Sequence, residues 1–191
     1  MKKILSLLAL TISASLNAGF YSNEDIDTYD PVYGKYYKAI EVKKETKGFL
    51  SKGDTFLTTN IAIYDPQTDT VKMLFEKDSQ RDINVFIFES AFKHEAIQFN
   101  GEITKYGGSY HSNIKNNAAI AERAPKNKLL IGTRDVKNKL MALWTAKKDG
   151  DDLTKITDVS FDSSWHIDIK NSMIRIITVK NGSFKIKNVA W

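Results

Sequence analysis

The sequence predicts a mainly β protein: an antiparallel meander, arranged as an incomplete propeller or as a β-sandwich, with one short helix in a long loop. Short segments rich in β-branched and aromatic residues recur along the 191-residue chain, which is typical of strands. Turn signals such as Asp149-Gly150 and Asn181-Gly182 separate these segments. Helical composition is confined to residues 118–124.

The N-terminal segment has the pattern of a cleavable export signal. Lys2 and Lys3 precede an apolar run over residues 4–14, and the small residue Ala18 follows, as in secretory leaders. The run is shorter than the roughly 20 residues needed to span a bilayer. We therefore expect a signal peptide over residues 1–18, a periplasmic or secreted mature protein of a bacterial-type cell, and no transmembrane segment after cleavage.

The chain after the leader is expected to hold one domain. Residues 22–30 contain four acids and no base, a composition that favours disorder. We therefore predict a poorly ordered lead-in over residues 19–34. A single β-rich domain is expected over residues 35–191, because a chain of this length can bury one self-sufficient core.

Most strands of this domain are predicted from short apolar runs between turns. Residues 55–64 and 71–75 flank a turn that contains Pro66, which indicates a hairpin. Further strands are expected at residues 36–43, 96–99, 128–134, 140–146, 153–156, 165–170, 173–179 and 183–186. Asn181-Gly182 suits a type I′ turn, whose two central residues both need a positive φ.

One predicted strand, residues 83–89, is apolar on both faces. Strict alternation places Ile83 and the other odd-numbered apolar residues on one side, and Phe86 and Phe88 on the other. A strand of this kind is covered on both sides. We therefore expect residues 83–89 at the centre of the fold.

Residues 100–128 interrupt the strand pattern, because they are rich in glycine and asparagine. Within them, Asn117 is a suitable N-cap and Pro125 a stop for the short helix at residues 118–124. A loop of this length in a compact domain often carries function.

Composition narrows the class of protein further. The chain has no cysteine, so it has no disulfides and no site for lipid attachment at a cysteine. Loss of Lys2 and Lys3 with the leader would lower the formal net charge from +5 to +3. This mild charge does not indicate a nucleic-acid partner, which asks for clustered basic residues.

Residues 143–157 carry an aromatic strand, an Asp-Gly turn and a Leu-Thr exit, LWTAKKDGDDLTKIT. This segment resembles the outer hairpin of blades in TolB-like β-propellers, and the resemblance implies stacked, propeller-like sheets. The mature chain also resembles a family of small exported β-rich bacterial proteins. That resemblance implies no activity.

No metal or cofactor site is predicted. The three histidines, His94, His111 and His166, lie far apart in the sequence, and no HExxH or cysteine pattern occurs. Gly107-Gly108 has no phosphate-loop context.

A catalytic site is not predicted either, and His166 with Asp168 is the strongest candidate for one. They stand at i and i+2 on one face of a predicted strand, close to Ser163 and Ser164. The serines lack the sharp elbow of a nucleophile motif. An envelope hydrolase that uses His166 and Asp168 remains an alternative function.

The function that we expect is binding of another protein in the cell envelope, as an inhibitor, an immunity protein or an assembly component, without catalysis. A rigid β scaffold with a long polar loop is a common arrangement for binding. Aromatic side chains are enriched at such sites. The candidate binding residues are Tyr33, Tyr36, Tyr37, Tyr106, Tyr110 and His111. A glycan-binding module that uses exposed aromatic side chains is the second alternative.

Overall fold

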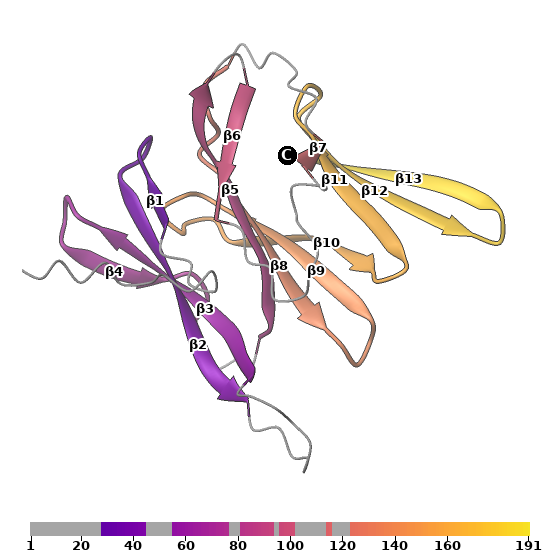
Figure 1. The fold of residues 1–191 in the computed structure, drawn as a ribbon, viewed down its shortest axis with the longest axis horizontal. Helices are drawn as coiled ribbons and strands as arrows, with labels where there is room; N and C mark the ends of the chain where they lie inside the picture. The colour runs from indigo at the N-terminus through magenta and orange to yellow at the C-terminus, as the bar shows by residue number, and fades with distance from the viewer. Residues whose placement is uncertain (1–27, 45–54, 77–80, 94–95, 102–113, 116–122) are drawn as a thin grey trace, which may run out of the picture.

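The computed structural model describes residues 28–44, 55–76, 81–93, 96–101, 114–115 and 123–191. These residues form three β-sheets and contain no helix (Figure 1). The predicted fold class, a mainly β chain of antiparallel strands, is confirmed. The predicted leader and most of the predicted helix at residues 118–124 lie outside the described residues; positions 123 and 124 are described and are not helical.

The first sheet is a four-stranded antiparallel meander in the order β1-β2-β3-β4. Its strands are β1 (Thr28–Asp30), β2 (Lys35–Lys44), β3 (Thr55–Asp65) and β4 (Thr70–Met73). β3 and β4 form the hairpin predicted around Pro66. Its turn is closed by the Asp65 carboxylate, which accepts a hydrogen bond from the Gln67 N–H at 3.0 Å, as expected of Asp in a turn.

The first sheet includes part of the predicted lead-in, because residues 28–34 form β1 and the turn after it. β1 pairs with β2, with Tyr29 opposite Tyr36. The acid at the end of β1, Asp30, is fully buried in an ion pair. One of the four acids that favoured disorder in this segment, Asp30, is therefore neutralised by a lysine of the folded chain.

The central sheet has five strands in the order β10-β9-β8-β5-β6. They are β5 (Ile83–Lys93), β6 (Ala96–Asn100), β8 (Leu129–Asp135), β9 (Leu140–Ala146) and β10 (Thr154–Ser160). The chain leaves the sheet after β6 and returns with β8 on the other side of β5. The segment between β6 and β8 thus connects strands on opposite sides of β5.

The third sheet has the order β13-β12-β11-β7. Its strands are β7 (Ile114–Lys115), β11 (Ser163–Asp168), β12 (Met173–Lys180) and β13 (Ser183–Ala190). β7 pairs parallel with β11, and the other pairs are antiparallel. β12 and β13 are joined by the predicted Asn181-Gly182 turn, in which both residues have positive φ, 51° and 72°.

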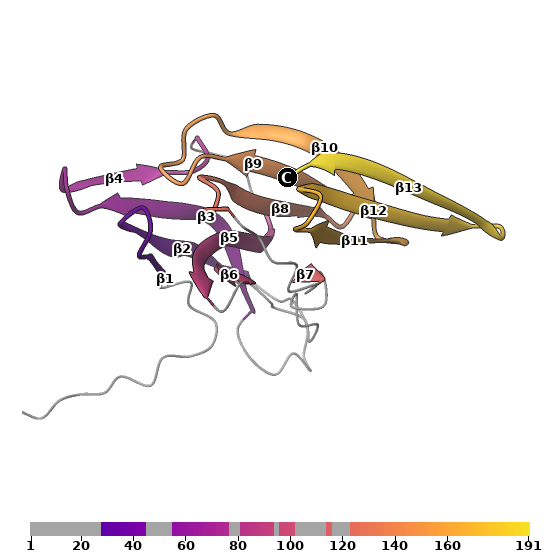
Figure 2. The ribbon, with the colours of Figure 1, turned by 90° about the horizontal axis from the view of Figure 1, so that it is seen from above.

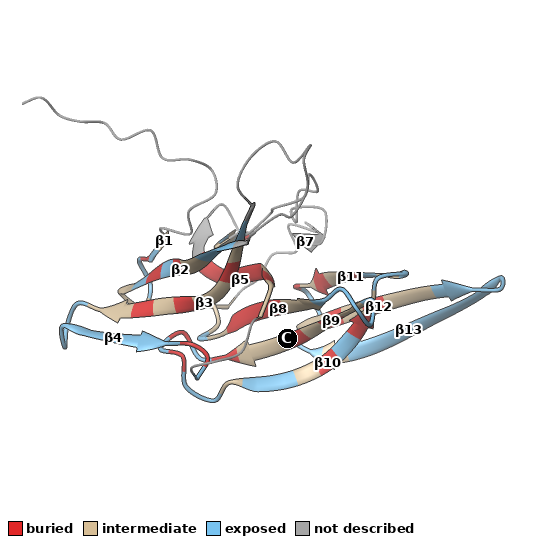
Figure 3. Ribbon diagram, turned by 90° about the horizontal axis from the view of Figure 1, so that it is seen from below, coloured by how far each residue is buried: buried red, intermediate tan, exposed pale blue. Residues whose placement is uncertain are grey.

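The central sheet lies between the other two and is buried on both faces (Figures 2 and 3). Phe86 and Phe88 of β5 belong to the apolar cluster shared with the first sheet. Val85 and Ile87 belong to the cluster shared with the third sheet. The prediction that this strand is covered on both sides is therefore correct.

The predicted side for Ile83 is wrong. Ile83 packs in the same cluster as Phe86 and Phe88 rather than with Val85. The register between β5 and β8 shifts between Ile83 and Val85. A β-bulge of this kind inserts one residue and moves the preceding side chains to the opposite face.

A tight contact between β8 and its neighbours gives a test of this packing. A Cβ added at Gly132 would lie 2.7 Å from Val85 Cγ2 and 3.0 Å from Met141 Sδ. We expect Gly132→Ala to lower the free energy of unfolding by about 1–3 kcal/mol through overpacking, measured by urea denaturation. Val136→Ala, in an exposed turn, should change it by less than about 0.5 kcal/mol. Equal effects of the two substitutions would contradict the packing described.

Candidate functional site

Three of the six candidate binding residues lie in the described part of the chain. These are Tyr33, in the turn between β1 and β2, and Tyr36 and Tyr37 in β2. The other three, Tyr106, Tyr110 and His111, lie outside the described residues. Because Tyr36 and Tyr37 are consecutive in a strand, their side chains point to opposite faces of the first sheet.

Tyr36 is part of a row of side chains that crosses the outer face of the first sheet. The strand register places Tyr29 opposite Tyr36, Tyr36 opposite Tyr64, and Tyr64 opposite Val71. Directly opposed residues of an antiparallel pair share a face. The ring centroids are 4.6 Å apart for Tyr29 and Tyr36, and 6.0 Å apart for Tyr36 and Tyr64. The row therefore forms a continuous line across all four strands.

This row is open to solvent. The exposed fractions are 45% for Tyr29, 47% for Tyr36 and 62% for Val71, and Met73 of the next row is exposed at 46%. Below, these five residues, Tyr29, Tyr36, Tyr64, Val71 and Met73, are named the tyrosine face. Sequence reasoning included only Tyr36, because the other four are brought beside it by strand register rather than by proximity in the chain.

A shallow groove of about 520 Å³ follows the tyrosine face. Its walls include the rings of Tyr29, Tyr36 and Tyr64, the side chain of Val71, and Lys38. The Tyr64 hydroxyl donates a hydrogen bond to Asp69 at 3.1 Å, and this bond raises the pKa of Tyr64. The groove thus combines apolar ring faces with hydroxyl groups at its rim.

Tyr37 is not available to a partner, because it is used inside the protein, and the half-buried Tyr33 makes an internal contact. The Tyr37 ring is buried against Phe86 and Phe88, and its hydroxyl donates to the backbone oxygen of Lys148 at 3.0 Å. Burial raises the pKa of Tyr37 above its ordinary value. The Tyr33 ring lies 4.4 Å from the Lys148 ammonium, in a cation–π contact.

Lys148 and Asp30 form a fully buried ion pair between the first and central sheets. Lys148 Nζ lies 2.8 Å from Asp30 Oδ2, and both side chains have no exposed area. The same Nζ donates to the backbone oxygen of Glu89 at 2.5 Å. Burial lowers the pKa of Lys148, although the nearby Asp30 carboxylate acts to raise it. The pair joins the end of β1 to the turn after β9.

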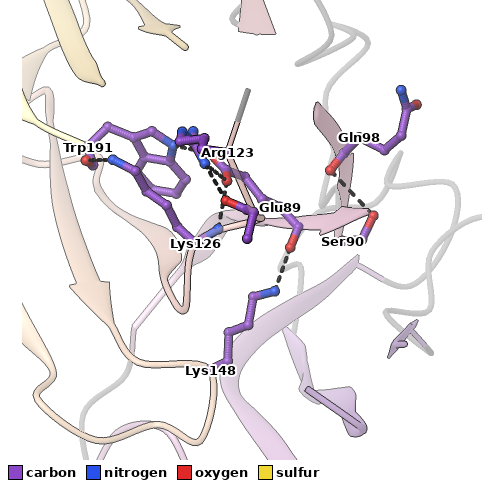
Figure 4. Close-up of polar contacts among 8 residues, drawn as sticks. Glu89, Ser90, Gln98, Arg123, Lys126, Lys148 and Trp191 are labelled. Carbon is purple, nitrogen blue, oxygen red and sulfur yellow. Dashed lines mark hydrogen bonds and ion pairs between the residues drawn. The ribbon is translucent and has the colours of Figure 1, made fainter. Parts of the chain in front are cut away.

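The Glu89 carboxylate makes a second buried charged site next to this pair (Figure 4). It accepts hydrogen bonds from both terminal nitrogens of Arg123, at 2.6 and 2.7 Å, and from the Lys126 N–H and the Trp191 Nε1–H, each at 2.8 Å. Burial acts to raise the pKa of Glu89, but the bonds from Arg123, Lys126 and Trp191 outweigh it, so the pKa is lowered.

We name Asp30, Lys148, Glu89, Arg123 and Trp191 the charged junction. Asp30 belongs to the first sheet, Glu89 to the central sheet, and Trp191 follows the last strand of the third sheet. Each carboxylate in it is held by donors of the same chain. Buried carboxylates whose oxygens are already bound by donors of the same chain are suited to fixing the sheets relative to one another rather than to acid–base chemistry.

His166 and Asp168 lie on the outer face of the third sheet, where the geometry does not favour a catalytic dyad. Asp168 Oδ2 lies 2.7 Å from Arg175 Nε and 2.8 Å from Asn171 Nδ2. Partial burial acts to raise the pKa of Asp168, but bonds from Asn171 and Arg175 lower it to about 2. Asp168 is thus bound to a guanidinium that sits opposite His166 in the sheet.

The neighbouring serines do not complete a catalytic arrangement. Of the two serines, Ser164 shares the outer face of β11 with His166 and Asp168, whereas the side chain of Ser163 points to the other face. Its hydroxyl is hydrogen-bonded to the Thr178 hydroxyl at 2.7 Å. Among the described residues, no group of three or more His, Cys, Asp and Glu side chains is placed to hold a metal ion.

Comparison with known proteins adds no further assignment, since no family description, curated protein or solved structure matches the chain.

Two substitutions test the charged junction. Lys148→Met keeps an unbranched side chain that is one atom shorter, but it leaves the Asp30 carboxylate buried without its cation. We expect it to lower the free energy of unfolding by about 3–5 kcal/mol. The neighbouring Lys147 pairs with Asp152 at the surface, so Lys147→Met should have little effect. Similar unfolding midpoints for the two variants in urea would contradict a stabilising role for Lys148.

Glu89→Gln should lower the free energy of unfolding by an amount that depends on pH. Because the folded-state pKa of Glu89 lies below its ordinary value of 4.5, ionised Glu89 stabilises the fold above that pH, and the contribution is lost as the pH falls through the folded pKa. At neutral pH we expect a loss of about 3–5 kcal/mol.

The difference in unfolding temperature between wild type and Glu89→Gln should therefore become smaller as the pH falls from neutral to below 4.5. Thermal unfolding over this pH range measures it. Asp158→Asn removes a surface carboxylate paired with Lys155 and serves as the control. A difference for Glu89→Gln that stays constant with pH would show that its charge does not matter.

Proposed function

We propose that this protein binds another protein through the tyrosine face, without catalysis, in the periplasm or outside the cell. The single observation that carries the proposal is the row of Tyr29, Tyr36, Tyr64 and Val71 across four strands, in which all but the half-buried Tyr64 are exposed. Tyrosine and methionine are enriched in protein–protein interfaces. In the described part of the chain, no helix is long and apolar enough to cross a bilayer.

The tyrosine face is preorganised for binding. The opposite face of the same strands packs Tyr37, Ile61 and Ile63 into the core shared with the central sheet. Its backbone is therefore held in place before a partner arrives. A rigid surface loses little conformational freedom on binding, and tyrosine provides a large contact area with only two side-chain torsions.

The arrangement of the rings favours a protein partner over a glycan. The planes of Tyr29 and Tyr36 are tilted by 35°, and those of Tyr36 and Tyr64 by 45°. The three rings therefore form no single flat platform on which a sugar ring could stack. Apolar side chains of a protein partner can instead pack into the groove that the rings line.

A site-specific crosslinking experiment tests this proposal. A photoreactive amino acid is introduced at Val71, on the tyrosine face, or at Val136, in a turn of the central sheet; both valines are similarly exposed, at 62% and 64%. After irradiation of intact cells of the native host, we expect one adduct of defined mass at position 71 and none at position 136. The mass of the recovered chain also shows whether it begins after Ala18.

The same cells carrying Tyr36→Ser in addition to the probe at position 71 should lose the adduct, because the substitution removes the central ring of the row. Adducts of equal yield at both positions, or none at position 71, would exclude the tyrosine face as a protein-binding site. Binding of the purified protein to a glycan array that disappears in Tyr36→Ser would favour the glycan-binding alternative instead.

A further inference from the structure

The β12–β13 hairpin carries a second candidate binding surface, far from the tyrosine face. The hairpin is part of the third sheet and projects beyond it at one end of the molecule, and the first sheet lies at the other end (Figure 1). β13 is the edge strand of the third sheet. Residues 183–188 are all exposed (Figure 3), so this edge is open along most of its length.

The backbone of β13 offers hydrogen-bonding groups at this edge. In a hairpin closed by a two-residue turn, the flanking pair, here Lys180 and Ser183, is hydrogen-bonded. Hydrogen-bonded and non-hydrogen-bonded pairs then alternate along the hairpin. Phe184, Ile186 and Asn188 therefore direct their N–H and C=O groups away from β12, toward solvent.

The side chains along the edge have a regular chemical pattern. Phe184 and Ile186 lie on the outer face, exposed at 63% and 47%, beside Val179 of β12. Lys185 and Lys187 lie on the opposite face, and the Lys187 ammonium donates to the Thr157 hydroxyl at 2.6 Å. A strand added beside β13 would thus meet apolar side chains on one face and ammonium groups on the other.

The lysines act against pairing of β13 with a second copy of itself. In the antiparallel register that places Ile186 opposite its own equivalent, Lys185 of each copy lies opposite Lys187 of the other. A shift by two residues places a lysine opposite its own equivalent. Like charges directly opposed across strands are unfavourable, and edge lysines are a known protection against such pairing.

The same charges favour an acidic strand. Residues 173–190, which form the hairpin, contain four basic residues and no acid. We propose that β13 binds an extended segment of another protein by strand addition. In that segment, apolar residues alternate with Asp or Glu: the apolar residues contact Phe184 and Ile186, and the acids pair with Lys185 and Lys187.

Designed peptides of the length of β13, 8 residues, test the inference on the full chain. One peptide alternates valine and glutamate, a second replaces glutamate by lysine, and a third has the composition of the first with valines and glutamates in two blocks. We expect saturable binding of the first in fluorescence anisotropy, and binding at least about tenfold weaker for the other two. In hydrogen exchange, the amides of Phe184, Ile186 and Asn188 should become protected.

Variants of the protein test whether the peptide binds at the β13 edge. Ile186→Pro removes an N–H that faces solvent and keeps the bonds to β12, as proline permits on edge strands, so it should abolish binding. Lys185→Glu, at an exposed position, should weaken the preference for the glutamate peptide over the lysine peptide, because Lys187 alone then remains to attract acids. Val71→Ser, on the tyrosine face, should leave peptide affinity unchanged, which keeps this inference separate from the proposed function.

Equal affinity for the acidic and basic peptides, or no binding of any peptide, would overturn the inference. Retained affinity in Ile186→Pro would do the same. Should Ile186→Pro lower the unfolding temperature, the charge reversal in Lys185→Glu decides, and an unchanged preference in that variant would count against strand addition at β13.

Discussion

The arrangement of the three sheets depends on compensating charges that have no contact with water. Asp30, Glu89 and Lys148 are completely buried, and an isolated charge in such a position would be strongly unfavourable. Each is matched by a partner from a different part of the chain: Asp30 with Lys148, and Glu89 with Arg123 and Trp191. A relative shift of the sheets would break these contacts while the charges stay buried, so few arrangements other than the observed one are tolerated.

This constraint explains how the outer surfaces can be well defined although no other sheet of the described chain packs against them. The first sheet is held from behind by the core and by Asp30, and its tyrosine face points outward. The third sheet is held by its apolar inner face and by Trp191. Its β12–β13 hairpin extends beyond these contacts. Two chemically different surfaces, one aromatic and one edged with lysine, thus lie at opposite ends of one scaffold (Figure 1).

The sequence was sufficient to predict most strands and turns, but not which residues of distant strands lie side by side. Alternation and turn residues identified the β3–β4 and β12–β13 hairpins and the doubly buried β5, because these signals are local. The side of Ile83 was missed, because a bulge leaves no mark in an apolar run. Tyr29, Tyr64 and Val71 meet Tyr36 only through strand register. Glu89 and Lys148 resembled ordinary strand-end and turn charges, since nothing near them in sequence reveals their distant partners.

The separation of those partners along the chain has a consequence for how the protein folds. The Glu89–Trp191 bond joins residues 102 positions apart, and the bond from Tyr37 to Lys148 joins residues 111 positions apart. Loops of this size close late, since their entropy is lost before the contacts that compensate it form. During synthesis, individual hairpins can appear early, but the hydrogen bond from Trp191 to Glu89 can form only after Trp191 has left the ribosome. The contacts that hold the three sheets together are thus expected to form late in folding, after the local hairpins.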